Sequence, residues 1–357
     1  MNSLGKKRRI LFVDQNLDGG GAERILCTVM RSLDPEEFDV HLVLIGNKGT
    51  LAHLIPDNVI VHELGINSTR HAIRPYIKIV KKLRPAVTFS SLSRTTVLSI
   101  LARPFCPHYK VIARYPNMPS LEIKYRAIKG WRKWLMEKTY NKVDVIISQT
   151  EEMAGELYKH YKIDKSKIHT IHNPIDTEHI DECIKNSNNP FDNQYINILA
   201  SGRLTYQKGF DTLINAFYIA SAQERKLRLH ILGQNIENYA SKLDYLVSQY
   251  NLQNKIVFYG FIENPYPFYK FCDLFILSSR WEGFPNVLLE NLYLKKRVIA
   301  TNCIPIINKL INNGNNGFIV EIESEEQLAE AILKYMELEP SDLETPSITE
   351  HIVNLLR

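Results

Sequence analysis

Residues 196–232, INILASGRLTYQKGFDTLINAFYIASAQERKLRLHIL, contain the clearest folding pattern of the chain. The apolar run 196–200 has the length of a strand, residues 209–222 have helical character, and residues 228–232 form a second apolar run. A strand, a helix of about 10–15 residues and another strand predict a βαβ unit with parallel strands. The turn at 201–209 follows the carboxyl end of the first strand, where open parallel sheets bind ligands.

The same alternation of strands and helices extends in both directions from this stretch. Residues 171–176 and the polar segment 185–190 separate two such series and predict a hinge and a linker. The predicted fold class is α/β, with two Rossmann-like, doubly wound parallel-sheet domains that face each other across a cleft. We expect the first domain at residues 1–172, the second at 173–340, and a short C-terminal tail or helix at 341–357.

The composition narrows the class of protein further. Of the 357 residues, 45% are hydrophobic and 23% are charged, which is typical of a globular protein rather than a disordered one. The apolar runs are far shorter than the ~20 residues that cross a bilayer, so an integral membrane protein is not expected. The five cysteines include no CxxC pair, which predicts neither a disulfide framework nor a zinc ribbon, and no metal site is expected.

Positive charge is concentrated in one region. Residues 70–142 contain 17 basic and 2 acidic side chains, and such a region attracts polyanions. Trp131 and Trp134 fall on one face of a helix predicted over residues 123–138, which leaves open two interpretations that do not exclude each other. The helix docks on an anionic membrane surface, or both tryptophans pack in the domain core. Nucleic acid is not an expected partner, because no nucleic-acid-reading motif accompanies the charge.

A glycine-rich turn follows the first predicted strand. Gly19, Gly20 and Gly21 precede a predicted helix. Consecutive glycines let the backbone approach a ligand closely, and the start of a helix offers unpaired N–H groups to an anion. The dinucleotide-binding pattern GxGxxG fails here, because its third position is Arg24. A tight turn without a ligand is the alternative.

Two cations lie in the turn at 201–209. Gly202 and Arg203 begin it, and Lys208 comes shortly before the helix. A fixed guanidinium and a mobile ammonium beside a helix N-terminus suit a diphosphate whose negative charge grows when a bond to it breaks. Arg203 and Lys208 are therefore candidate catalytic residues.

Two carboxylates follow a later strand of the second series. Glu282 lies in the turn after the predicted strand 274–277, and Glu290 lies eight residues further, in the helix that Gly283, Phe284 and Pro285 open. This spacing lets the two carboxylates face one pocket at different depths. They can then bind separate hydroxyl groups of a sugar nucleotide.

Four motifs, in this order, give the chain a family resemblance: GGGAE at 19–23, NPID at 173–176, GRLTYQKG at 202–209 and EGFPNVLLE at 282–290. Together they resemble the retaining GT-B glycosyltransferases of glycosyltransferase family 4. The resemblance is strongest to bacterial enzymes that build surface polysaccharides, such as capsule and lipopolysaccharide, or lipid-linked oligosaccharides. It covers about residues 9–335 and is more specific in the C-terminal half.

The resemblance implies a GT-B fold and a role for each matched residue. The donor would be a nucleotide sugar, with UDP as the expected nucleotide, bound mainly by residues 173–340. Arg203 and Lys208 would bind its diphosphate, Glu282 would lie beside the transferred sugar, and Glu290 would bind the ribose hydroxyls. The other expected donor-binding residues are Gly20, Gly21, Gly202, Phe261, Ile262, Gly283, Phe284 and Pro285.

The implied reaction transfers a hexose or N-acetylhexosamine with retention of configuration. It needs no metal and no cofactor, because the leaving phosphate helps to deprotonate the acceptor. The acceptor would be a glycolipid, a polyprenyl-diphosphate-linked glycan or a polysaccharide. The enzyme would be cytoplasmic and peripheral on the inner face of the membrane, with the anionic surface as a partner. The expected residues on the acceptor or membrane side are Arg114, Tyr115, Lys129, Trp131, Arg132, Lys133 and Trp134.

Two other functions stay open. A nucleotide-sugar epimerase of the same fold would convert the donor without any acceptor. A non-enzymatic membrane- or polyanion-binding protein with a degenerate donor site would bind lipid but no nucleotide sugar. Residues 303–309, CIPIINK, lack the glycine and the glutamate of the family pattern CPSGPRE, so they do not identify the donor sugar.

Overall fold

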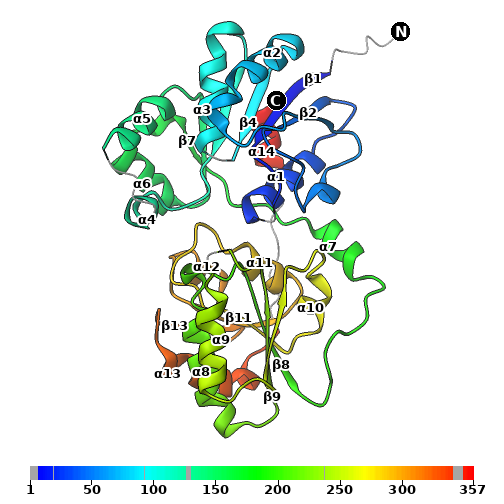
Figure 1. Cartoon of the computed structure of the whole chain (residues 1–357), viewed down its shortest axis with the longest axis vertical. Helices are drawn as coiled ribbons and strands as arrows, with labels where there is room; N and C mark the ends of the chain where they lie inside the picture. Colours follow the sequence, from blue (N-terminus) through cyan, green and yellow to red (C-terminus); the bar gives the residue numbers. More distant parts are fainter. Residues whose placement is uncertain (1–6, 19, 92, 126–129, 237, 341–348) are drawn as a thin grey trace. The chain divides into compact units, whose positions relative to one another are not determined.

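The computed structural model describes residues 7–357 apart from 19, 92, 126–129, 237 and 341–348 (Figure 1). The chain divides into two units. Unit 1 comprises Met1–Pro174 and Ser347–Arg357, and unit 2 comprises Ile175–Pro346. Each unit has its own parallel sheet and its own apolar core.

Unit 1 contains a seven-stranded parallel sheet with the order β3-β2-β1-β4-β5-β6-β7. The direction in which the chain adds strands reverses between β1 and β4, as in a doubly wound sheet. β1 contains the apolar run 10–13, and all of these side chains are fully buried, as expected for a parallel strand covered on both faces. The strands are β1 (Arg8–Asp14), β2 (Phe38–Leu44), β3 (Ile60–Glu63), β4 (Val87–Ser90), β5 (Lys110–Arg114), β6 (Val145–Ser148) and β7 (Ile168–Thr170).

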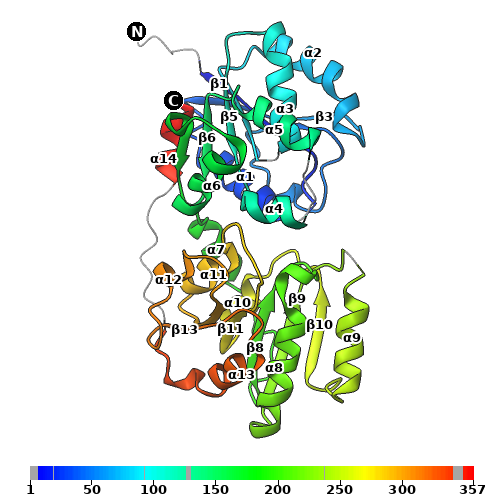
Figure 2. The same cartoon turned by 90° about the vertical axis from the view of Figure 1, so that its left-hand side faces the viewer.

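Helices join these strands and pack against the sheet (Figures 1 and 2). They are α1 (Gly21–Arg31), α2 (Ile73–Leu83), α3 (Ser93–Ala102), α4 (Pro119–Tyr125), α5 (Trp131–Tyr140) and α6 (Glu151–Tyr161). Short 3₁₀ turns lie at Ala52–Leu54, Thr69–His71, Arg103–Phe105 and Lys165–Lys167.

The C-terminal helix α14 (Thr349–Leu356) belongs to unit 1, although unit 2 precedes it in the chain. Leu356 is fully buried. Arg8 Nε and Lys110 Nζ donate to the carbonyl oxygens of Leu356 and Leu355 at 2.8 and 3.0 Å. Cations at the last carbonyls of a helix stabilise it. The described part of the expected C-terminal tail is therefore not separate but packs with the first unit.

Unit 2 contains a six-stranded parallel sheet with the order β10-β9-β8-β11-β12-β13. Here the direction reverses between β8 and β11. Ile198 of β8 packs in a buried cluster with Leu213 and Phe217 of α8, so the strand and helix predicted from 196–222 share one core. The strands are β8 (Ile196–Ser201), β9 (Leu227–Leu232), β10 (Ile256–Gly260), β11 (Leu274–Leu277), β12 (Arg297–Thr301) and β13 (Gly317–Val320).

The helices of unit 2 lie mostly between consecutive strands (Figure 1). They are α7 (Thr177–Ile184), α8 (Phe210–Gln223), α9 (Ala240–Gln249), α10 (Tyr266–Phe271), α11 (Asn286–Tyr293), α12 (Ile307–Leu310) and α13 (Glu325–Leu333). Short 3₁₀ turns lie at Tyr206–Lys208 and Tyr335–Glu337.

The predicted tryptophan-bearing helix differs from the one in the structure. The sequence pattern placed residues 123–138 on one helix face, whereas α4 ends at Tyr125 and α5 begins at Trp131. Gly130 has φ 56° and ψ −128°, a conformation that is open almost only to glycine. A continuous helix through this position is therefore wrong.

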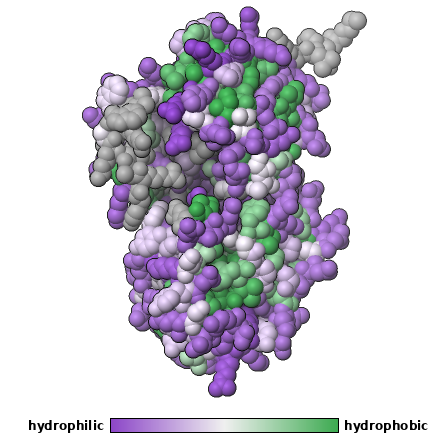
Figure 3. All heavy atoms as spheres, viewed as in Figure 1, coloured by the Kyte–Doolittle hydropathy of each residue, from purple (hydrophilic) through white to green (hydrophobic). Residues whose placement is uncertain are grey.

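Polar side chains cover most of the face drawn in Figure 3, with apolar side chains between them. Such a mixed surface is usual for a folded domain. Within the described part of the chain, no helix combines the length and the apolar character needed to cross a bilayer.

Candidate functional site

The candidate site lies on unit 2, at the carboxyl edge of its sheet. β8 and β11 are neighbours in the sheet, but the chain continues from β8 toward β9 and from β11 toward β12, in opposite directions. Doubly wound sheets bind ligands at such a reversal. The loop after β8 (202–209) and the loop after β11 (278–285) contain most of the predicted donor residues, and we call them the β8 loop and the β11 loop.

An ion pair joins these two loops. Lys208 Nζ lies 2.7 Å from Glu282 Oε1, and Ser279 Oγ donates to the same oxygen at 2.6 Å. Only 14% of the Lys208 side chain and 7% of the Glu282 side chain are exposed. Removing one partner of a pair at this depth leaves the other charge uncompensated. The structure thus brings together two predicted site residues that are 74 positions apart in sequence.

Gly209 allows the two loops to meet. Its φ is 63°, in the left-handed region that favours glycine. A Cβ built on Gly209 would lie 2.1 Å from the carbonyl oxygen of Ser278. Ser278 Oγ in turn donates to the carbonyl oxygen of Lys208 at 2.9 Å. Any side chain at position 209 would therefore push apart the loops that carry Lys208 and Glu282.

Further hydrogen bonds extend this junction. The Arg280 backbone N–H donates to the Gln207 carbonyl at 2.7 Å, and Gln207 Nε2 donates to the Trp281 carbonyl at 2.9 Å. Thr301, at the end of β12, donates through Oγ1 to the Ser279 carbonyl at 2.5 Å. The β8 and β11 loops are therefore tied to each other and to the neighbouring strand.

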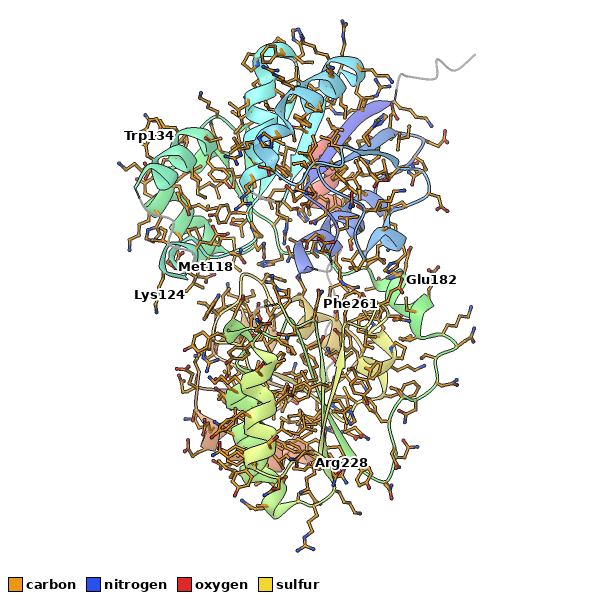
Figure 4. All side chains as sticks on the ribbon, viewed as in Figure 1. Met118, Lys124, Trp134, Glu182, Arg228 and Phe261 are labelled. Atoms are coloured by element: carbon orange, nitrogen blue, oxygen red, sulfur yellow. The ribbon has the colours of Figure 1, made fainter. Side chains whose placement is uncertain are left out.

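The other predicted donor residues lie along the same edge. Arg203 is exposed, and no hydrogen bond or ion pair to another described residue holds its guanidinium. The expectation of a fixed guanidinium and a mobile ammonium is therefore wrong for these residues, because it is the Lys208 ammonium that is held, by Glu282. Glu290 is half-buried on α11. Phe261 and Ile262 follow β10, and Phe261 lies at the end of the sheet opposite to Arg228 (Figure 4). Gly202 is half-buried, and Gly283, Phe284 and Pro285 are buried.

The segment that departs from the family pattern reaches the same junction. Cys303 follows β12 and is half-buried. Burial raises the pKa of its thiol to about 12, and the nearby Glu282 carboxylate adds to the increase. A thiol with this pKa is neutral near pH 7 and is a poor nucleophile. Ile304 and Ile306, which follow it, are also buried.

Two predicted residues of unit 1 lie at the end of β5 and are buried. Arg114 Nε and Nη2 donate to Asn173 Oδ1 at 3.2 and 2.7 Å, and burial lowers the pKa of its guanidinium to about 10. The hydroxyl of Tyr115 donates to Glu122 Oε2 at 2.5 Å. Tyr115 is thus a core residue whose hydroxyl is already bonded, and contact of either residue with an acceptor stays a prediction.

The glycine turn lies beside a buried acid that the sequence argument missed. α1 begins at Gly21 and has Gly20 as its N-cap residue, as the glycine turn predicts. Asp14, the last residue of β1, is fully buried, and no described hydrogen bond reaches its Oδ2. Burial raises its pKa to about 8, and the Glu23 carboxylate adds to the increase. An acid directly after the apolar run 10–13 was the sequence feature that could have revealed it.

The surface of unit 1 tests core packing for one of the two tryptophans, Trp134, while membrane docking stays a prediction. Its side chain is 58% exposed and lies at the outside of α5 (Figure 4), so it is not a core residue. Leu101 and Phe105 lie near the end of α3, which packs against α5, and are 52% and 53% exposed. Lys129 lies outside the described residues, as do the side chains of Trp131, Arg132 and Lys133.

Two protein-family models match the chain, one after the other. The model described as Glycosyltransferase Family 4 matches residues 19–179, and the model described as Glycosyl transferases group 1 matches residues 181–347. The second match contains both loops of the candidate site.

Relatives match along nearly the whole chain. A Campylobacter jejuni protein is 26% identical over 339 residues, which cover 90% of this chain and 88% of the relative. It is named N-acetylgalactosamine-N,N'-diacetylbacillosaminyl-diphospho-undecaprenol 4-alpha-N-acetylgalactosaminyltransferase. An Escherichia coli protein is 21% identical over 378 residues, which cover 99% of this chain and 94% of the relative. It is named UDP-Gal:alpha-D-GlcNAc-diphosphoundecaprenol alpha-1,3-galactosyltransferase.

A solved structure supports the same conclusion about the fold. Anabaena HepE in complex with UDP and glucose matches with a TM-score of 0.75 and 18% identity, over 98% of this chain and 94% of that chain. This likeness confirms the predicted GT-B fold class. The family descriptions and the names of the relatives favour sugar transfer over epimerisation or a non-enzymatic role. The chain therefore belongs to the GT-B glycosyltransferases of glycosyltransferase family 4.

Proposed function

We propose that this protein transfers a hexose or N-acetylhexosamine from a UDP-sugar to a lipid-linked glycan, with retention of configuration. The Lys208–Glu282 pair, 2.7 Å apart at the reversal point of the unit 2 sheet, carries the proposal. Two relatives support the lipid-linked acceptor, because their names specify diphospho-undecaprenol sugars. UDP as the nucleotide is supported by the name of the Escherichia coli relative and by the UDP in the HepE structure.

The two cations of the β8 loop suit the donor diphosphate. The Lys208 ammonium has three N–H donors, so it can keep its bond to Glu282 while it donates to a phosphate oxygen. Arg203 is exposed and can bind the same diphosphate with two parallel hydrogen bonds. Negative charge grows on the leaving UDP as its bond to the sugar breaks. Both cations therefore bind the transition state more tightly than the donor.

The two carboxylates, Glu282 and Glu290, bind different parts of the sugar nucleotide. Oε1 of Glu282 accepts from Lys208 and Ser279, which leaves Oε2 for a hydroxyl of the transferred sugar. Glu290, on α11, takes the ribose hydroxyls. Gly20 and Gly21, at the start of α1 in unit 1, stay predicted donor-binding residues.

Retention follows from attack on the same face of the sugar that the phosphate leaves. The acceptor hydroxyl oxygen bonds to the anomeric carbon while the bond from that carbon to the phosphate oxygen breaks. The hydroxyl proton passes to the leaving phosphate. Neither an enzyme nucleophile nor a metal takes part in this proposal.

We further propose that unit 1 docks on the inner face of the cytoplasmic membrane. Exposed Leu101, Phe105 and Trp134 supply apolar and aromatic groups for the headgroup zone. These residues belong to the basic region 70–142, and Lys81 Nζ of that region lies 5.3 Å from the centre of the Phe105 ring. A basic side chain therefore lies directly beside this apolar group. Each basic residue near an anionic leaflet contributes about 1 kcal/mol, so several suffice for reversible docking.

A thermal-shift screen against UDP, GDP, ADP and CMP tests the donor site, with Arg203→Ala and Lys208→Ala as variants. A nucleotide at ~100 times its dissociation constant adds about 2.7 kcal/mol of stability. We expect stabilisation by UDP alone, most of which is lost in each variant. Stabilisation by another nucleotide would contradict the UDP assignment, and stabilisation by none would contradict the donor site.

Two further measurements test the proposed retention of configuration and the proposed membrane docking. Proton NMR of the transferred sugar reports its anomeric configuration, and an inverted product would contradict retention. Flotation with vesicles that contain or lack phosphatidylglycerol tests membrane docking. We expect binding only to the anionic vesicles and weaker binding by Trp134→Ala, with Tyr245→Ala of unit 2, which removes a side chain that is 67% exposed, as the matched control. Equal binding to both kinds of vesicle would contradict the proposal.

A further inference from the structure

We infer that Arg280 is the positioning residue of the donor site, because it clamps the β8 loop, which carries Lys208, against the β11 loop, which carries Glu282. The inference rests on the function proposed for that pair. Arg280 lies two residues before Glu282, and its side chain is only 9% exposed. Its hydrogen bonds reach the β8 loop, the start of α8 and the segment after β13.

The contacts with the β8 loop fix the backbone directly before Lys208. The Arg280 backbone N–H donates to the Gln207 carbonyl at 2.7 Å, and its Nη1 donates to the Tyr206 carbonyl at 2.7 Å. The guanidinium carbon lies 3.9 Å from the centre of the Tyr206 ring, within the range of a cation–π contact. Tyr206–Lys208 form a single 3₁₀ turn, so anchoring its first two residues also sets where the Lys208 side chain begins.

Asp211, in the first turn of α8, fixes the other side of the guanidinium. Nη1 donates to Oδ1 at 2.9 Å and Nη2 donates to Oδ2 at 3.0 Å, which is the two-pronged geometry of an arginine with a carboxylate. Burial raises the pKa of Asp211, but hydrogen bonds from Arg280 and Lys242 outweigh it and hold this pKa well below its usual range. A lysine at position 280 has a single ammonium and cannot make both bonds.

A third segment is held by the same side chain. Arg280 Nε donates to Glu323 Oε1, and the Tyr206 hydroxyl donates to the same oxygen at 3.2 Å. Glu323 has φ 61°, in the left-handed region that non-glycine residues seldom adopt. Arg280 and Tyr206 thus hold a strained residue after β13 against the two donor loops.

The contacts of Arg280 predict an effect on the position of Lys208 that is distinct from an effect on nucleotide binding. The described side-chain partners of Arg280 are Tyr206, Asp211, Thr212 and Glu323, and none of them is proposed to hold the base or the ribose. Loss of the clamp should displace the Lys208 ammonium without removing its charge from the diphosphate. It should therefore disturb the transfer step more than the binding of UDP. A misplacement of about 1 Å at a reacting group can cost on the order of 10²-fold in rate. We expect a fall of about 100-fold in kcat for Arg280→Ala, with a change below about threefold in the dissociation constant of UDP.

The experiment compares Arg280→Ala and Arg280→Lys with a matched control, Lys242→Ala. Lys242 Nζ bonds the same Asp211 carboxylate at 2.8 Å, but its described contacts lie outside both donor loops. Asp211→Asn is a second test of the clamp, because it removes the charge opposite Arg280 and keeps the shape of the side chain. The readouts are kcat and KM for UDP-sugar, calorimetric binding of UDP, and thermal unfolding followed by circular dichroism. Rescue of Arg280→Ala by millimolar guanidinium ion is a further readout.

The inference predicts that kcat falls in both Arg280 variants and in Asp211→Asn, while UDP binding persists and Lys242→Ala stays within about twofold of wild type. Guanidinium ion should restore part of the activity of Arg280→Ala. A folded Arg280→Ala protein with wild-type kcat would overturn the inference. Parallel loss of kcat, UDP binding and cooperative unfolding would also overturn it, because the role would then be merely structural. A wild-type protein that binds no nucleotide would refute the proposed function itself, which separates the two failures.

Discussion

Replacement of Gly209 by alanine gives the sharpest test of how the donor loops are assembled. The φ of 63° at this position costs an alanine roughly 1–2 kcal/mol. The added Cβ would also begin 2.1 Å from the Ser278 carbonyl oxygen, and Cβ atoms essentially never come closer than 3.0 Å to such an atom. The β8 and β11 loops must therefore separate by about 0.9 Å, the difference between these two distances.

This separation acts on the hydrogen bonds that join the loops. The bonds from Ser278 Oγ to the Lys208 carbonyl (2.9 Å) and from the Arg280 N–H to the Gln207 carbonyl (2.7 Å) are the ones most directly stretched. Each is worth about 1 kcal/mol. Together with the backbone cost, Gly209→Ala should destabilise unit 2 by about 3–4 kcal/mol. Because the Lys208–Glu282 pair spans the same loops, kcat/KM should fall by about 100-fold.

Urea unfolding with a fluorescence readout and an assay of sugar transfer would measure the two effects. Gly155→Ala is the matched control, because this glycine lies inside α6 and a Cβ added to it meets no described atom within 4 Å. Alanine is preferred to glycine in a helix by about 0.5–1 kcal/mol, so the same substitution should stabilise unit 1 and leave transfer unchanged. A Gly209→Ala protein with wild-type stability and activity would contradict the account of the loop junction.

Three other predictions concern stability and the support of the site. Above about pH 4 an unfolded Asp14 loses its proton, whereas the folded carboxyl keeps it up to its raised pKa of about 8. Wild-type stability should therefore fall between about pH 4 and 8, by at most ~1.4 kcal/mol per unit, and Asp14→Asn should remove this slope in urea unfolding. An unchanged slope would count against a buried neutral acid. Leu356→Ala should destabilise unit 1 by about 2–5 kcal/mol in thermal unfolding, because this side chain of α14 is fully buried; an unaltered transition would show that α14 is not docked. Ser279→Ala should lower kcat/KM about tenfold by removing the 2.6 Å hydrogen bond to Glu282, and wild-type kinetics would exclude this support.

The fold could be predicted where strands are apolar and helices are bounded by turns. The strand at 274–277 has the predicted bounds, because it has a uniform apolar pattern and polar neighbours. β3 was not predicted, and it is a short strand at the edge of the unit 1 sheet with no fully buried side chain. Edge strands lack the apolar run that identifies a buried parallel strand.

Candidate site residues could be identified in the sequence one by one, but their arrangement could not. Lys208 and Glu282 were identified in separate turns, and nothing in the spacing of 74 positions shows that they meet. They meet because β11 lies beside β8, whereas β9 and β10 lie on the other side of β8. Arg280 and Asp14 were missed for a related reason. Arg280 lies in a turn and Asp14 lies at the end of a strand. Each acquires its role from partners that only the order of the strands in the sheet brings close.

The central claim is that unit 2 presents a UDP-sugar for transfer to a lipid-linked glycan. The most direct measurement incubates the purified protein with radiolabelled UDP-N-acetylglucosamine, UDP-N-acetylgalactosamine, UDP-glucose or UDP-galactose and a polyprenyl-diphosphate-linked acceptor, and follows label and mass in the lipid fraction. The account predicts that one donor adds a single sugar to the lipid, that omission of the acceptor stops the reaction, and that Lys208→Ala lowers the rate by roughly 10²–10³-fold. A donor sugar that changes its configuration without any acceptor, or equal rates for wild type and Lys208→Ala, would contradict it.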